Sequence, residues 1–516
     1  MKRFIIPAML LSALTFQSCE LDLSPENTLT YTNAFTTEAE LATTTASIHF
    51  FLSTAFGNNA TIMAAGSKLD ELTEMSDVRN WNPQMVARSD NDWKSLYDII
   101  FESNLLLDNI HRTKDLPENR YNYHTGQAQF ALGLCYLALA QRYSSAIITE
   151  DSKTIKMYSN VPQAEVLDEA IKHAEKAYQL LPTLSNMTDL KGAPTNCRQY
   201  ASKGAAATLL ANIYAWRGSL KDLYGKGENS AEDYKKAVDY AGEVINGKTG
   251  NYRLCASAEE LCQYLSDADK ENPETIFALV FDYTRSSYTT SPNSPGLSYV
   301  GWPVDRTKQE GDIEIDNSFR LYKETVLDMY PDENDERKAA FFYEIDKDHM
   351  SGDHNYAVLY KFREPINDPD QTAEHGFYFR TIKSDYTYWR LADLLLLRAE
   401  CNNKLNNTAA AMVDLNLVRS RAKAAAYPAN GENDLKKAIF KERERELIAE
   451  NDGRYYDIIR NGYVKTELQG KFPLLTKSDI ANGALFLPIP TSAFKSNEGI
   501  VINTQIQQSP YWLPYM

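Results

Sequence analysis

The 516-residue sequence lacks the short motifs on which most catalytic assignments rest. It contains neither a G-x-x-x-x-G-K-S/T phosphate loop nor a G-x-S-x-G nucleophile elbow. Its carboxylates are so numerous that no pair stands out as the two acids of a glycosidase. These absences argue against a nucleotide hydrolase and an α/β-hydrolase, and we expect no catalysis and no cofactor.

Cysteine is also scarce, and its spacing excludes two common uses. Five cysteines follow Cys19, an odd number without a C-x-x-C pair, which argues against a disulfide framework and a zinc site. Cys135 and Cys401 lie in helical patterns and are expected to be small core residues. Cys255 and Cys262 could pair, and the sequence leaves that open.

Basic residues are outnumbered, since 54 Lys and Arg stand against 70 Asp and Glu, for a net charge of −16. Loss of residues 1–18, which hold Lys2, Arg3 and no acid, takes the charge to −18. Nucleic acids require a basic face, so this charge argues against them, and also against adsorption to anionic lipid.

Long hydrophobic runs are absent, apart from a short one near the start. Phe4–Phe16 is apolar and follows two basic residues, but it falls short of the roughly 20 residues of a membrane-spanning helix. It reads as the core of a secretory signal over residues 1–18. Ser18 precedes Cys19, so we expect Cys19 to be lipidated, although Phe16 replaces the usual Leu. Ordinary signal cleavage is the alternative.

One group of residues resembles a metal site. Calcium loops place oxygen ligands at alternate positions and glycine at the sixth, but Met350 and Ser351 occupy the fifth and sixth positions here. A solvated acidic loop is therefore favoured, and we predict no metal. The residues concerned are Asp346, Asp348, His349, Asp353 and His354.

Apolar residues at three- and four-residue steps predict helices in the first half of the chain. The last two of these helices resemble a tetratricopeptide pair, with a generic helical hairpin as the alternative. Gly218 is expected to end the fourth. The predicted helices are Asp92–Ile110, Thr125–Tyr143, Ala164–Leu181, Ala201–Arg217 and Ala231–Asn246.

The middle of the chain is interrupted by Gly, Pro, Ser and Asp, which predicts loops with two short strands, Glu274–Phe281 and Tyr356–Arg363. The run from Tyr283 to Trp302 is a long loop of the kind that is usually functional or disordered. Helical patterns return in the last third of the chain, at Trp389–Cys401, Thr408–Lys423 and Leu435–Glu450.

The predicted fold is mainly α, a tetratricopeptide-like helix-pair scaffold with a loop-rich insertion that carries a few short strands. We divide the chain into a signal peptide, a lipidated tether, a helical scaffold, a ligand-face insertion, and C-terminal helices with an irregular tail. The corresponding ranges are 1–18, 19–30, 31–247, 248–384 and 385–516.

Three late segments carry a more specific signal: Arg390–Glu400 with Asp414–Ala422, then Glu442–Leu447 with Gly453–Arg460, then Leu485–Pro490 with Gln505–Tyr511. In this order, behind a lipobox, they resemble the SusD/RagB family of Bacteroidetes outer-membrane nutrient-binding lipoproteins. The ending Gln507-Gln508-Ser509-Pro510-Tyr511 departs from the family's Q-N-P-G-Y.

That resemblance implies a nutrient-binding lipoprotein, not an enzyme, that faces the cell exterior. It implies a SusC-like TonB-dependent outer-membrane transporter as partner, with the lipoprotein as a lid that delivers an oligosaccharide or another nutrient. The late motif residues themselves look structural. The alternatives are a surface glycoside hydrolase and a helical-repeat adaptor that binds only protein.

The binding face is an inference from residue chemistry. Sugar rings have an apolar face and a polar rim, so exposed aromatic side chains on loops suit them, with amides or arginines nearby to read hydroxyls. Ordinary packing is the alternative for each aromatic, and Trp81 is the first choice. The predicted ligand-binding residues are Arg79, Trp81, Asn82, Tyr283, Tyr288, Tyr299 and Trp302.

Overall fold

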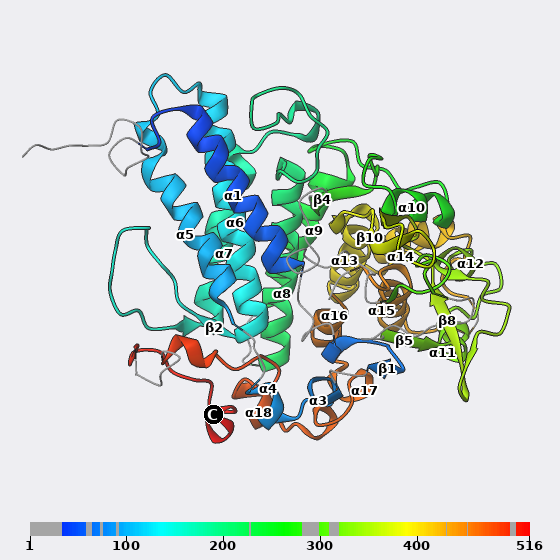
Figure 1. The fold of residues 1–516 in the computed structure, drawn as a ribbon. Helices are drawn as coiled ribbons and strands as arrows, with labels where there is room; N and C mark the ends of the chain where they lie inside the picture. The colour runs from blue at the N-terminus through cyan, green and yellow to red at the C-terminus, as the bar shows by residue number, and fades with distance from the viewer. Residues whose placement is uncertain are drawn as a thin grey trace, which may run out of the picture.

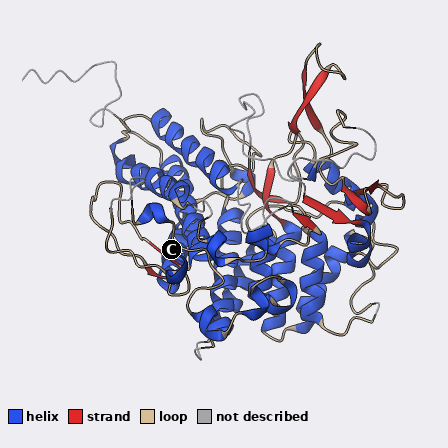
Figure 2. Ribbon diagram, turned by 60° about the horizontal axis from the view of Figure 1, so that its bottom comes forward, coloured by secondary structure: helices blue, strands red, loops and turns tan. Residues whose placement is uncertain are grey.

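The computed structural model confirms the mainly α class, with few and short strands (Figures 1 and 2). Cys19, Tyr283 and Tyr288 lie outside the residues that the structure describes. Within the described residues, no helix is both long and apolar enough to cross a membrane. The described ranges are 34–57, 64–72, 76–88, 92–225, 229–280, 299–308, 319–429, 431–450, 453–495 and 502–516.

Six long helices form the N-terminal part and lie side by side in Figure 1. The apolar pattern does not predict the first of them, α1, whose threonines have low helix propensity. Its start is held by Glu40, which accepts a hydrogen bond from the backbone N–H of Thr37 at 3.0 Å. The helices are α1 (Glu38–Phe56), α5 (Lys94–Asn109), α6 (Glu118–Tyr143), α7 (Gln163–Leu180), α8 (Lys203–Tyr224) and α9 (Ala231–Ile245).

The prediction that Gly218 ends the fourth helix is wrong. Helix α8 continues to Tyr224 and ends at Gly225, which adopts a left-handed φ of 60°. Gly218 instead lets α9 approach, because a Cβ there would lie 2.9 Å from Cε1 of Tyr234. Helices α8 and α9 thus pack as the antiparallel pair that the sequence predicts.

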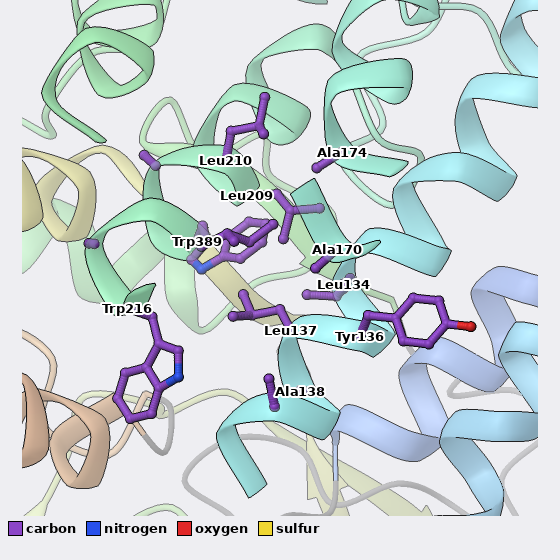
Figure 3. Packing of buried hydrophobic residues seen from close by; sticks show 14 of the residues in the cluster. Leu134, Tyr136, Leu137, Ala138, Ala170, Ala174, Leu209, Leu210, Trp216 and Trp389 are labelled. Atoms are coloured by element: carbon purple, nitrogen blue, oxygen red, sulfur yellow. The ribbon is translucent and has the colours of Figure 1, made fainter. Parts of the chain in front are cut away.

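Apolar side chains between α6, α7 and α8 form the centre of the larger hydrophobic core (Figure 3). This core also takes in residues of the C-terminal helices and of strand β11 (Tyr386–Arg390), so the two halves of the chain share it. Its buried members include Leu134, Leu137, Ala170, Ala174, Leu209 and Trp389.

Most strands lie on one side of the molecule (Figure 2), whereas β2 and β3 lie beside α6 and α7. The sheet that includes β5, β6 and β8 packs on a second hydrophobic core. One sheet has the order β1-β5-β8-β6, with β7 also paired to β8, and every pairing is antiparallel. Both predicted strands are present, as β4 and β8. The elements are β1 (Glu71–Leu72), β4 (Thr275–Leu279), β5 (Phe319–Tyr322), β6 (Phe342–Tyr343), β7 (Met350–Ser351), β8 (His354–Leu359), β9 (Pro365–Pro369), β10 (Phe377–Ile382), α10 (Ala258–Leu265), α11 (Lys323–Met329) and α12 (Arg337–Phe341).

In the C-terminal third of the chain, helices alternate with irregular segments. The predicted helix from Trp389 begins two residues later, because Tyr386–Arg390 pairs with β4 as strand β11. Cys255 and Cys262 are buried free thiols. The remaining elements are α3 (Ser76–Arg79), α4 (Pro83–Val86), β2 (Ser145–Ala146), β3 (Val161–Pro162), α13 (Leu391–Lys404), α14 (Thr408–Arg421), α15 (Leu435–Glu446), α16 (Gly453–Asn461), α17 (Val464–Glu467) and α18 (Lys477–Ala481).

A buried ion network joins the second core to the C-terminal helices. Glu446, at the end of α15, is fully buried and pairs with Arg390 at 2.7 Å, with Arg337 at 3.0 Å, and with Arg421. Burial opposes its ionisation, yet these three guanidinium groups hold the pKa of Glu446 below its usual range. Arg390 also pairs with Glu450 at 2.7 Å. The network therefore fixes α12, α14, α15 and β11 against one another.

The prediction that Trp81 is an exposed stacking residue is wrong, because its side chain is 0% exposed. Its ring stacks on Phe472 with centroids 4.8 Å apart, and its Nε1 donates to the carbonyl of Ala484 at 2.8 Å. Trp512 covers its edge. Residues about 400 positions later in the chain cover this segment, and no local pattern around Trp81 signals them.

We expect Glu446→Gln to lower the free energy of unfolding by about 3–5 kcal/mol, because it leaves three buried arginines short of a counter-charge. Denaturant unfolding followed by circular dichroism measures this. The matched control is Asp98→Asn, which breaks an exposed pair with Lys94 and should cost about 0–1 kcal/mol. Equal, small losses in both variants would contradict a central role for the network.

Trp81→Ala should destabilise the protein by about 3–5 kcal/mol, because it empties a closely packed aromatic site. Trp81→Phe keeps a ring but loses the hydrogen bond to Ala484, and should cost less. Chemical denaturation of the two variants tests this. A Trp81→Ala protein of unchanged stability would show that the ring is not a core residue.

Candidate functional site

A polar groove of about 530 Å³ lies between the segment before β1, helix α11 and helices α15 and α17. Its size falls within the range of ligand pockets, roughly 300–1,000 Å³. We call it the Arg79 groove. Its charged and amide lining residues are Lys68, Asp70, Arg79, Asp328, Lys441, Glu444, Arg445, Glu467 and Gln469.

Arg79, at the end of α3, lines this groove and is held by main-chain atoms. Its Nη1 donates to the carbonyl of Asp70 at 3.3 Å, and its Nη2 donates to the carbonyl of Leu69. Burial lowers the pKa of Arg79, although the negative charge of Asp70 opposes this shift. The guanidinium is thus oriented by neutral acceptors.

Asp70 fixes the wall of the groove to the neighbouring strand and helix. Its Oδ2 accepts from the backbone N–H of Tyr322 at 2.6 Å, and its Oδ1 accepts from Oγ1 of Thr325 at 2.8 Å. Its own N–H donates to the carbonyl of Arg320 at 2.9 Å. These contacts hold β1, β5 and α11 in register at the edge of the groove.

The next residue, Glu71, organises an aromatic cluster beside the groove. Its Oε1 accepts from the hydroxyls of Tyr322 and Tyr356 at 2.8 and 2.9 Å, and its Oε2 lies 3.4 Å from Nη1 of Arg320. Burial opposes the shift, but these hydrogen bonds lower the pKa of Glu71. Burial together with Glu71 raises the pKa of Tyr322 to about 12. Glu71 therefore stays a carboxylate, and Tyr322 stays a hydroxyl donor, across the physiological range.

His354 extends this cluster to the surface. Its ring stacks on Tyr322, with centroids 4.7 Å apart and planes 10° from parallel. The His354 side chain is 51% exposed. We call these two rings the Tyr322–His354 platform. A flat, accessible ring pair beside carboxylate and phenol oxygens can stack on the apolar face of a sugar while it reads hydroxyls.

Two residues of the acidic loop that resembles a calcium site have other partners. Asp348 pairs with Lys323 at 3.0 Å, and His349 Nε2 lies 3.2 Å from the carbonyl of Tyr343. Across the described ranges, no three His, Cys, Asp or Glu side chains converge as a metal site.

The structure separates the residues that the sequence groups together. Arg79 lines the groove, while Asn82 caps α4, where its side chain accepts from Gln84 N. Tyr299 is partly buried against the second hydrophobic core, to which Val78 also packs. Trp302 is partly buried, and its Nε1 has no acceptor in the described part of the chain. The two segments that carry Val78 and Tyr299 thus pack against the same hydrophobic core, although their predicted ligand-binding residues do not form one site.

Sequence reasoning missed Glu71, Tyr322 and His354. Tyr322 and Glu71 are 251 positions apart, so no spacing rule links them. The one available signal was the alternation of aromatic and polar residues in His354–Tyr356, which is typical of a strand with one accessible face.

A second, smaller cavity of about 80 Å³ lies between α6, α8, β11 and α16. At roughly 10–15 Å³ per molecule it has room for a few waters, and it is too small for a sugar. In its lining, Arg443 already pairs with Asp393 at 2.7 Å and with Asp457 at 2.8 Å. The groove is therefore the better candidate.

Solved structures share this fold over nearly the whole chain. A SusD homologue from Bacteroides thetaiotaomicron matches with a TM-score of 0.72 at 18% identity, covering 92% of this chain and 98% of that one. A laminarin-binding SusD-like protein matches with a TM-score of 0.65 at 19% identity, covering 92% and 99%.

Sequence comparisons reach the same family. SusD-like protein P25 from Formosa agariphila is 22% identical over 446 residues, which cover 80% of this chain and 78% of that protein. A family described as "Starch-binding associating with outer membrane" matches residues 21–215. The SusD family matches residues 224–512, more than half of the sequence. The chain belongs to the SusD family.

Proposed function

We propose that this protein is a lipid-anchored outer-membrane protein that binds an oligosaccharide and delivers it to a SusC-like TonB-dependent transporter. The observation that carries the proposal is the match to SusD-family sequences over residues 21–215 and 224–512. Lipidation of Cys19, an exterior-facing orientation and the transporter partner are parts of the same proposal. A relative of similar fold is described as laminarin-binding, which supports a glycan as ligand.

The ligand face is the surface around β1. The Tyr322–His354 platform offers ring faces, and the Arg79 groove beside it offers hydroxyl, amide and charged groups. Sugar-binding sites combine these two chemistries, because a sugar ring has apolar C–H faces and a polar rim. Trp81 has no place in this proposal, since its ring is enclosed.

The state of the groove's acids supports binding without hydrolysis. Glycosidases need one carboxyl group with a raised pKa as general acid. Glu444 pairs with Arg454 at 2.7 Å and with Lys441 at 3.1 Å. Burial opposes their effect, but these cations lower the pKa of Glu444. Glu467 pairs with the same two cations at 2.8 and 3.2 Å. Glu444 is therefore not set up to donate a proton to a leaving group.

We expect Tyr322→Ala and His354→Ala to weaken oligosaccharide binding by roughly tenfold each, because each removes half of the stacked pair. Isothermal titration calorimetry against neutral and acidic oligosaccharides tests this. The control is Tyr121→Ala, which removes a 40% exposed tyrosine on α6, away from β1. No heat with any oligosaccharide, or equal losses in all three variants, would contradict the proposal.

A further inference from the structure

We infer that the Arg79 groove takes an acidic group of the ligand, a carboxylate or a sulfate carried by an oligosaccharide, with Arg79 and Lys68 as its cationic contacts. This inference rests on the proposed function and names the chemical class of its ligand. Both residues line the groove, and its volume of about 530 Å³ accommodates a charged sugar unit.

Arg79 carries a positive charge that the described residues do not neutralise at close range. Its side-chain hydrogen bonds go to the main-chain carbonyls of Leu69 and Asp70, and among the described residues no carboxylate forms an ion pair with it within 4 Å. Because carbonyls orient a guanidinium without cancelling its charge, the remaining N–H groups are preset for an anion. The lowered pKa of Arg79 agrees with this, since burial outweighs the attraction of Asp70.

Lys68 stands on the same wall and is exposed. No ion pair or hydrogen bond joins its ammonium to any residue in the described ranges, although its field lowers the pKa of Glu444. The two other cations of the groove are occupied. Lys441 pairs with Glu444 and Glu467, and Arg445 pairs with the fully buried Glu442 at 2.8 Å.

Four acids also line the groove, and three of them have donors. Glu444 and Glu467 share Arg454 and Lys441. Asp70 accepts from Tyr322 N and Thr325 Oγ1. Asp328 is exposed on α11. Glu444, Glu467 and Asp70 are thus bound by donors of the protein itself. Arg79 and Lys68 are the groove cations that remain open to a ligand. Asp328 can accept a hydroxyl from the same sugar.

An acidic oligosaccharide would therefore bind more tightly than its neutral counterpart, and salt would reduce the difference because part of the groove is open to solvent. Calorimetry with matched pairs tests this. One arm compares uronate hexasaccharides of several linkages with their methyl esters. The other compares sulfated hexasaccharides with their desulfated forms. The two arms distinguish a carboxylate from a sulfate as the bound group.

We expect the acidic form of at least one pair to bind about tenfold more tightly at low salt. Lys68→Gln and Arg79→Gln should each remove most of this preference and leave the neutral form within about twofold, whereas Arg79→Lys should retain part of it. Arg79→Gln removes a hydrogen bond to the main chain at Leu69 and could disturb the backbone there. Among the described residues, Lys68→Gln breaks no such contact, so it tests the charge preference independently.

Equal or tighter binding of the neutral forms would overturn the inference. So would variants that weaken both forms alike, because the groove would then not read charge. If neutral oligosaccharides bind with no acidic preference, the inference alone fails. If no oligosaccharide of either kind binds, the proposed function fails, and this inference fails with it.

Discussion

Three arginines from three elements converge on the Glu446 carboxylate, and the position of the proposed ligand face depends on this junction. Arg337 comes from α12, Arg390 from β11 and Arg421 from α14. Removal of any one partner leaves a buried charge undercompensated, so the elements hold one another in place. Lys361, just after β8, adds a fourth cation by pairing with Glu450. The sheet that carries Glu71 and Tyr322 is thereby fixed to the helical scaffold.

This arrangement explains why a largely helical protein carries its polar groove at the strand-bearing side. The larger core between α6, α7 and α8 is filled with apolar side chains, and the cavity between α6, α8, β11 and α16 holds only about 80 Å³. The groove instead lies between the segment before β1 and helices α11, α15 and α17. Asp70 accepts from the backbone N–H of Tyr322, and Glu71 accepts from its hydroxyl. One short segment, Asp70 followed by the first residue of β1, thus serves both the groove and the platform.

Eight of the longer helices, and the two strands in the middle of the chain, follow from local patterns, because periodicity and stop signals lie within a few residues of each other. Helix α1 was not predicted, because its threonines interrupt the apolar periodicity and have low helix propensity. One of the residues predicted to bind ligand lies at the candidate groove. Arg79 lines the groove, but Trp81, two residues later, is covered by Phe472 and Trp512. Tyr356 and Glu71, 285 positions apart, meet only through the fold. Contacts between residues so far apart along the chain depend on tertiary packing, which cannot be derived from the local pattern of a single sequence.

Amide hydrogen exchange with and without a bound oligosaccharide tests the central claim, that ligand is held at the surface around β1. The account predicts slower exchange on binding in residues 64–72, 76–79 and 319–329, with α1 and α5 unchanged. Slower exchange confined to α1 and α5, with those three segments unaffected, would contradict it.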